Sequence, residues 1–103
     1  MQSERFEWDD RKAEANLRKH QVSFQEGATV FDDELGMEVD DLEHSWDEPR
    51  QILIGTSSSS KVLLVIYVDR LLQNGRERYR IISARKATPS ERSIYEAQRK
   101  ASR

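Results

Sequence analysis

Runs of β-favouring apolar residues, each bounded by turn signals, recur in the second half of the chain and predict three strands. The runs cover residues 50–56, 61–69 and 76–85. Four serines (57–60) separate the first two runs, and Asn74-Gly75 lies between the second and third, so both connections are expected to be hairpins. The middle run is apolar on both faces over 62–68, which predicts a central strand covered on both sides.

Helix-capping residues open three further segments. The segments and their caps are 10–19 after Asp9, 24–31 after Ser23, and 89–99 after Thr88. A glutamate three residues after the cap completes a capping box in the last two segments, and Pro89 suits the first helical position. Ala13, Asn16 and Leu17 give the first helix a thin apolar face, so we expect it to lie on a sheet rather than inside a bundle.

Two short strands complete the predicted pattern. Phe6 and Trp8 flank Glu7 in an alternating run that is typical of an edge strand, and residues 37–39 form the second short run. The predicted order is β-α-α-β-β-β-β-α within a single domain over residues 1–103. This order indicates the α+β class, with a small antiparallel sheet, two N-terminal helices and a C-terminal helix.

Composition excludes several classes of protein. The chain has no cysteine, so a disulfide framework, a thiol nucleophile and a thiolate metal site are all impossible. Charged residues make up 35% of the chain and apolar residues 36%, which is typical of a small domain with a heavily solvated surface. The longest apolar run is too short to span a bilayer and the N-terminus does not resemble a signal peptide, so a cytoplasmic location without membrane contact is expected.

The charges are divided unevenly along the chain. Residues 1–69 contain 7 Lys/Arg and 16 Asp/Glu, whereas residues 70–103 contain 10 Lys/Arg and 3 Asp/Glu. This division indicates an anionic partner for the C-terminal third. The acidic section either meets a basic protein partner or keeps the chain in solution, and the sequence leaves both open.

Residues 80–92 are the most informative stretch for chemistry. A predicted strand carries Arg85 and Lys86 into a strand–helix corner, which is a suitable place to hold a phosphate. Arg50 and Arg70, at the ends of other strands, extend a possible cluster of guanidinium groups, whose planar fork binds phosphate in a bidentate manner. The alternative is a well-capped structural corner with an arginine-rich solvent face.

Strict alternation along the last strand predicts how its side chains are divided between the two sheet faces. One face is expected to carry Arg78, Arg80, Ile82, Ala84 and Lys86. The other face is expected to carry Tyr79, Ile81, Ser83 and Arg85. Cationic side chains would then occur on both faces.

Four residues are candidates for proton transfer: His20, His44, Glu91 and Tyr95. For each, a structural or surface explanation competes with a catalytic one. His20 follows two cations at a predicted helix C-terminus, where capping is an alternative role, and Glu91 is already explained by the capping box.

The acidic loop after residue 40 contains two further features. Trp46 stands in a polar segment, where an exposed tryptophan indicates a contact with a protein partner. His44 lies near Asp41 and Asp47, but their spacing matches no metal-ligand pattern, so no metal site is predicted.

Taken in order, a set of short motifs resembles the BrnT family of toxins. The motifs are Phe6-Glu-Trp-Asp9, Lys12, Asn16, Lys19-His20, Val22-Ser-Phe24-Gln-Glu26, Ala28-Thr-Val-Phe31-Asp32, His44-Ser45, Glu48-Pro-Arg50, Ile54-Gly55, Arg70, Arg80-Ile-Ile-Ser-Ala-Arg-Lys-Ala87, Glu91-Arg92 and Tyr95. The resemblance covers residues 6–96. It departs from the family pattern at Gln21, where glycine is usual, at Asp10, where proline is common, and at Gly27 within the second helix.

The resemblance implies a RelE-like ribonuclease with a small twisted antiparallel sheet and no cofactor. Its implied activity is RNA cleavage that arrests growth, and our first hypothesis is that the cleavage proceeds without a metal ion by attack of the 2′-hydroxyl. Its implied partner is an antitoxin of the BrnA type with a ribbon-helix-helix region, through which operator DNA is reached only indirectly. A different class of function also fits: a catalytically inert module that binds nucleic acid or antitoxin and acts in operon autoregulation.

Carried over by position, the resemblance ranks the candidate residues. Arg85 is the first candidate for the active site, followed by Arg70 and Arg50, with His20 and Glu91 in support. The expected RNA-binding residues are Arg80, Lys86, Arg78 and Tyr95.

Overall fold

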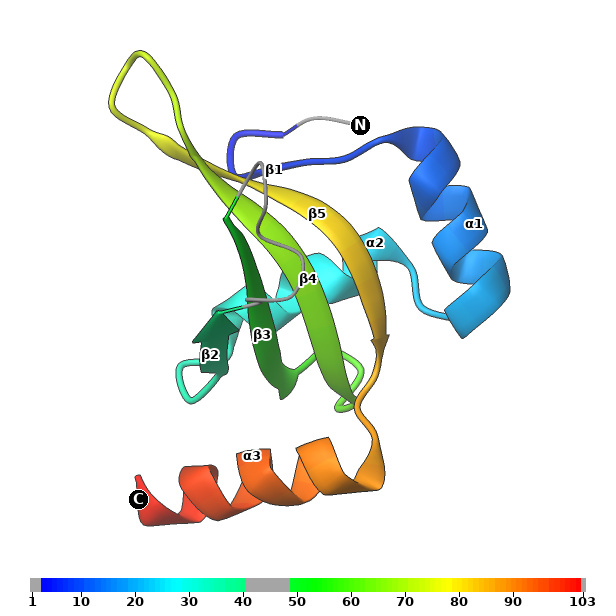
Figure 1. The fold of residues 1–103 in the computed structure, drawn as a ribbon, viewed down its shortest axis with the longest axis vertical. Helices are drawn as coiled ribbons and strands as arrows, with labels where there is room; N and C mark the ends of the chain where they lie inside the picture. The colour runs from blue at the N-terminus through cyan, green and yellow to red at the C-terminus, as the bar shows by residue number, and fades with distance from the viewer. Residues whose placement is uncertain (1–2, 41–48, 103) are drawn as a thin grey trace.

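The structure, a computed structural model, describes residues 3–40 and 49–102 and has the α+β architecture predicted from the sequence (Figure 1). Within these described residues, one five-stranded sheet is accompanied by three α-helices and a short 3₁₀ turn. The elements in order are β1 (Phe6–Glu7), α1 (Asp10–His20), α2 (Phe24–Thr29), η1 (Val30–Asp32), β2 (Met37–Asp40), β3 (Arg50–Thr56), β4 (Val62–Leu71), β5 (Glu77–Lys86) and α3 (Pro89–Ala101). This order agrees with the predicted one.

The strand order across the sheet is β1-β5-β4-β3-β2, and β2 to β5 form an antiparallel meander. The two predicted hairpins are present, with Ser60 (φ 63°) and Gly75 (φ 82°) in the left-handed region at the turns. The expectation of an entirely antiparallel sheet is wrong at one edge, because β1 pairs parallel to β5. Residue patterns define strands but not the direction in which two distant strands meet.

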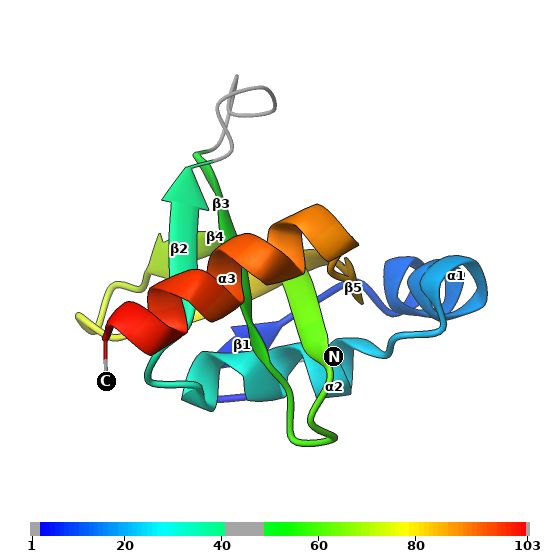
Figure 2. The ribbon, with the colours of Figure 1, turned by 90° about the horizontal axis from the view of Figure 1, so that it is seen from below.

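The helices occupy different sides of the sheet. α2 lies behind the sheet in Figure 1, α1 lies beside the β5 edge, and α3 crosses the end of the sheet where β5 finishes (Figures 1 and 2). In the part of the chain that the structure describes, no helix is long and apolar enough to cross a membrane.

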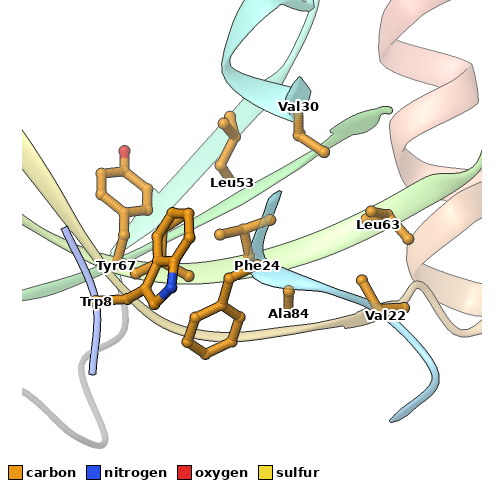
Figure 3. Packing of buried hydrophobic residues seen from close by; sticks show 10 residues of the cluster. Trp8, Val22, Phe24, Val30, Leu53, Leu63, Tyr67 and Ala84 are labelled. Atoms are coloured by element: carbon orange, nitrogen blue, oxygen red, sulfur yellow. The ribbon is translucent and has the colours of Figure 1, made fainter. Parts of the chain in front are cut away.

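The larger core cluster fills the space between α2 and the sheet (Figure 3). Phe24 and Val30 are fully buried there, and the ring of Trp8 packs edge-on against Phe24 with centroids 5.9 Å apart. Tyr67 from the central strand is 2% exposed. Trp8 and Tyr67 are therefore core residues and are not available for stacking on a base.

A smaller cluster attaches α3 to the opposite face. Ile54, Leu64 and Tyr95 are its buried members. β4 therefore sends alternate side chains into both clusters, as its apolar run predicted. α3 contributes one buried residue, Tyr95, whereas Ile94 is 57% exposed. This helix is attached through a narrow contact.

A β-bulge in β5 changes the direction of its side chains. Ile66 of β4 pairs with Ser83, but the next residue, Tyr67, pairs with Ile81, so Ile82 has no partner. An extra residue reverses the alternation beyond it. Ile81 and Ala84 are consequently both buried in the same cluster.

The predicted division of the last strand is therefore wrong beyond the bulge. Arg85 pairs with Leu64, whose side chain belongs to the cluster under α3, so Arg85 shares a face with Arg78 and Arg80. Lys86 pairs with Leu63 and lies on the α2 side. A two-residue period read from sequence cannot reveal a bulge, because the extra residue leaves no gap in the apolar pattern.

Asn16 of α1 holds this bulge. Its Nδ2 donates to the carbonyl oxygens of Ala84 at 2.7 Å and Val22 at 2.9 Å, and its Oδ1 accepts from the Ala84 amide at 3.2 Å and the Ser83 hydroxyl at 3.3 Å. The side chain is buried and all its polar atoms have partners. The face of α1 that was predicted to be apolar therefore contacts the sheet partly through the polar side chain of Asn16. Leu17 is 50% exposed instead of facing the core.

Gln21 ends α1 where a glycine is usual. Its backbone adopts φ 57° and ψ 30°, its amide donates to the Leu17 carbonyl, and its side chain donates to the Arg18 carbonyl. The left-handed C-cap is therefore present without glycine.

Asn16→Ala should destabilise the protein by about 2–4 kcal/mol, because buried backbone groups of Ala84 and Val22 would lose their partners. The free energy of unfolding from urea titration measures the effect. Leu17→Ala, one position along the same helix and half exposed, is the matched control and should change stability by no more than about 0.5 kcal/mol. Equal stability of Asn16→Ala and the wild type would contradict the assigned role of Asn16.

Candidate functional site

Four arginines from β3, β4 and β5 lie on the sheet face opposite α2, toward the end remote from α3. We call this surface the arginine face; its members are Arg50, Arg70, Arg78 and Arg80. Val68 of β4 pairs with Arg50 of β3 on one side and with Arg80 of β5 on the other. Neighbouring strands are about 4.8 Å apart, so the two arginine Cα atoms are separated by roughly 10 Å. Side chains of that length can meet over Val68.

Arg80 and Arg78 are partly buried arginines without an acidic partner among residues 3–40 and 49–102. Each is of intermediate exposure. No ion pair or hydrogen bond from a described residue engages the guanidinium of Arg80, and the Nε atom of Arg78 is buried without an acceptor. A partly desolvated guanidinium that lacks a counter-charge favours binding of an anion.

A carboxylate completes the row in which Arg80 lies. Glu7 of β1 is the registered neighbour of Arg80, so Glu7, Arg80, Val68 and Arg50 form one line across four strands, which we call the transverse row. Arg70 Nη1 donates to both oxygens of Glu7, at 3.0 and 3.1 Å. Sequence reasoning missed Glu7 as a site residue. The available signal was its position between Phe6 and Trp8, which places it on the face opposite theirs.

Arg85 lies at the other end of this side of the sheet and is bound to α3. Its Nη1 and Nη2 donate to the two oxygens of Glu91 at 2.8 and 3.0 Å. Glu91 also accepts from the Thr88 amide at 2.8 Å, which completes the capping box. Arg85 therefore has a structural role: it ties the end of β5 to the first turn of α3.

The ion pair also changes the chemistry of Glu91. The hydrogen bonds from Arg85, opposed by burial and supported by the Thr88 amide, lower the pKa of Glu91 to about 2. A carboxylate with so low a pKa is a poor proton acceptor near neutral pH. Its geometry and pKa suit a structural ion pair rather than a general base.

Arg85 lies on the same side of the sheet as the arginine face but far from its four members. Arg85 pairs with Leu64 and Arg70 lies six residues further along β4, which corresponds to about 20 Å of strand. One phosphate cannot be gripped by both guanidinium groups. The hypothesis that Arg85 and Arg70 act together on one phosphate does not fit this geometry.

His20 and Lys86 lie away from the arginine face. His20 lines a shallow pocket between α1 and β5 together with Lys12, Lys19 and Ser83. Lys86 is exposed on the α2 side of the sheet. The structure therefore does not bring these two residues together with Arg50 and Arg80.

Tyr95 is part of the core and not of an RNA-stacking surface. It is 1% exposed, and its hydroxyl donates to Asp33 at 2.5 Å and lies 2.9 Å from the Thr56 hydroxyl. Burial and the hydrogen bond to Asp33 raise the pKa of Tyr95. The structure therefore does not present Tyr95 on the surface for the expected contact with RNA.

Asp33 is the anchor for Tyr95. Burial alone would raise its pKa, but hydrogen bonds from Tyr95 and from the amides of Thr56 and Leu35 lower it overall. Asp33 thereby joins α3 to the end of η1 and to β3.

The acidic loop with Trp46 and His44 lies outside the described residues, so the partner contact expected for Trp46 stays a prediction. Within residues 3–40 and 49–102, no group of three His, Asp or Glu side chains is arranged to hold a metal ion.

The fold is that of a small α+β protein, and the arginine face is a cationic surface on one side of its sheet. Residues 8–91 match the family described as ribonuclease toxin, BrnT, of type II toxin–antitoxin systems. The chain belongs to this family. Among solved structures, the Brucella abortus ribonuclease toxin BrnT is similar in fold, with a TM-score of 0.60 at 20% sequence identity, over 84% of this chain and 99% of that chain. No curated protein matches the sequence significantly.

Glu91→Gln should remove the part of the stability that the wild type loses in acid. Because folding lowers the pKa of Glu91 from 4.5 to about 2, its carboxylate stabilises the folded state above pH 4.5, and this contribution is lost as the pH falls toward 2. At pH 7 the variant should be less stable by about 1–3 kcal/mol, a range that allows for partial solvent screening.

Unfolding by urea at a series of pH values tests this expectation. The variant should show a smaller loss of stability than the wild type between pH 5 and pH 2. Glu96→Gln, which breaks the exposed pair with Arg92 on the same helix, is the control and should cost about 0.5 kcal/mol or less. Parallel stability–pH curves for Glu91→Gln and the wild type would refute the assignment.

Proposed function

We propose that this protein is an endoribonuclease toxin that cleaves RNA on its arginine face, without a metal ion, by attack of a 2′-hydroxyl on the adjacent phosphate. Family membership supports a ribonuclease of a type II toxin–antitoxin system. The observation that carries the location is Arg80: it is partly buried, has no acidic partner among the described residues, and faces Arg50 across Val68.

The chemistry requires cationic groups at the reacting phosphate. When the 2′-oxygen attacks, the O2′–P bond forms, the P–O5′ bond breaks, and negative charge increases on the non-bridging oxygens in between. Guanidinium groups fixed in place before the reaction stabilise that charge at no cost of reorganisation. Arg50 and Arg80 suit this role because they approach the same point from two strands.

The remaining arginines extend the surface for the RNA chain. Arg78 and Arg70 occupy the next position toward the hairpin, directly opposite each other in the β4–β5 register. Successive phosphates of a single strand can then lie along the β4–β5 pair. Such contacts add affinity independent of sequence and make binding sensitive to salt.

Arg85 contributes indirectly in this proposal. Its bidentate pair with Glu91 fixes the strand–helix corner, and the helix α3 covers Ile54 and Leu64 at that end of the sheet. Loss of Arg85 should therefore act mainly on stability. The candidate ranked first from sequence becomes a structural residue here.

An antitoxin partner follows from membership in a type II toxin–antitoxin family. We propose an antitoxin of the BrnA type, with a ribbon-helix-helix region that binds operator DNA, so that the toxin reaches DNA only through it. Co-expression with the product of the adjacent reading frame tests this: it should restore growth and co-purify with the toxin. A neighbouring product without a ribbon-helix-helix pattern would contradict the antitoxin type.

Arg80→Ala and Arg50→Ala should each reduce RNA cleavage by about 10²–10³-fold, because each removes one electrostatic contact to the transition state. Cleavage of a short single-stranded RNA by purified protein and growth arrest on induction are the measurements. EDTA should leave the wild-type rate unchanged.

Arg76→Ala is the matched control, since Arg76 is exposed in the hairpin and its side chain makes no hydrogen bond or ion pair with the described residues. It should cleave at nearly the wild-type rate. Undiminished cleavage by Arg80→Ala and Arg50→Ala would refute the location of the site. Wild-type protein that binds RNA but leaves it intact would indicate a binding module instead of an enzyme.

A further inference from the structure

The acidic residues of the sheet are distributed in an unequal way between its two faces. The described strands contain five acids: Glu7, Glu38, Asp40, Asp69 and Glu77. The last four of these acids lie on the α2 side, because they pair with residues of that face: Leu53, Gln51, Tyr79 and Leu71. On that side, burial and the charges of three of the acids (Glu38, Asp69 and Asp40) raise the pKa of Tyr67. Among these five strand acids, Glu7 is the one that lies on the arginine face.

Glu7 occupies a specific position on that face. It is the registered neighbour of Arg80, and Arg70 Nη1 donates to both of its oxygens from the diagonal position. The Glu7 side chain is only 18% exposed, whereas that of Arg70 is 47% exposed. The carboxylate is therefore held in a fixed orientation at one end of the transverse row, beside the guanidinium that would carry the phosphate.

The ion pair between Glu7 and Arg70 has only a small structural effect. An ion pair with one half-exposed partner contributes about 0–1 kcal/mol to stability. β1 is already attached to β5 by backbone pairing and by the ring of Phe6, which packs against Phe31 and Tyr79. Glu7 is thus a partly buried carboxylate with a small structural effect, next to Arg80, which has no acidic partner among the described residues.

We propose that Glu7 is the general base of the cleavage reaction and that Arg70 is its positioning residue. This inference rests on the proposed function and names a catalytic residue within it. A carboxylate that accepts from Arg70 through both oxygens retains a lone pair on each for a third donor. The 2′-hydroxyl of a nucleotide whose phosphate lies between Arg80 and Arg50 is that donor.

The proton and bond changes balance without a cofactor. The 2′-hydroxyl proton moves to a Glu7 oxygen as the O2′–P bond forms, giving a 2′,3′-cyclic phosphate. The P–O5′ bond breaks and the leaving oxygen takes a proton from water. Glu7 then releases its proton to solvent, which restores the carboxylate.

Glu7→Gln tests the proposal, because glutamine has nearly the same size and can still accept a hydrogen bond from Arg70 but cannot take up the proton. Single-turnover cleavage of a short single-stranded RNA should slow by about 10²–10⁴-fold. A 2′-deoxy version of the same RNA cannot be cleaved by this route. It should bind to Glu7→Gln at least as tightly as it binds to the wild type, since the substitution removes a negative charge near the phosphate. The urea midpoint should stay unchanged.

The pH dependence separates a base from a mere partner of Arg70. The wild-type rate should fall as the pH is lowered, and the residual rate of Glu7→Gln should lack this acid limb. Glu7→Asp keeps the carboxylate at a shorter reach and should retain part of the activity. Glu77→Gln, on the opposite face of the same sheet region, is the control and should behave as the wild type.

The outcomes distinguish this proposal from the one on which it rests. Full activity of Glu7→Gln together with an inactive Arg80→Ala would overturn the role of Glu7 and leave the arginine site intact. A slow Glu7→Gln that keeps the acid limb would also overturn it, since another group would then be the base. Full activity of both Glu7→Gln and Arg80→Ala would remove the site itself.

Discussion

The attachment of Asn16 to the bulge in β5 is the interaction on which the arrangement of the other residues depends. Its amide group satisfies the backbone of Ala84 and binds Val22, so a single buried side chain joins α1, the loop after it and the last strand. The bulge turns Ala84 into the core. It also brings Arg85 to the same side as Arg78 and Arg80. A bulge redirects the side chains that follow it, and this one has that effect on Ala84 and Arg85.

The sheet separates opposite charges that the net charge of −2 conceals. Four acidic strand residues lie on the α2 side, and the guanidinium groups of the arginine face lie on the other. A face of one sign attracts an anionic chain over a longer range than any single pair does. Glu7 is the exception: it lies among the arginines, and this position is the basis for proposing it as the general base.

The strand–helix corner at residues 85–91 has a structural role. Thr88 and Glu91 cap α3, Arg85 binds Glu91, and Tyr95 reaches Asp33 near the end of η1. These contacts hold a helix that has only one buried apolar side chain. The strand–helix corner therefore supports the fold at one end of the sheet, while the residues proposed to act on RNA lie at the other end, on β1, β3, β4 and the first half of β5.

Sequence by itself determined the elements, their order and the α+β class, because capping residues, turn signals and apolar periods are local. It did not determine the parallel pairing of β1, the bulge at Ile82 or the partners of Arg85 and Glu7, since each depends on residues far apart in the chain. Only the tertiary structure placed Glu7 beside Arg80, because strand register, and not spacing along the sequence, decides which side chains meet across a sheet.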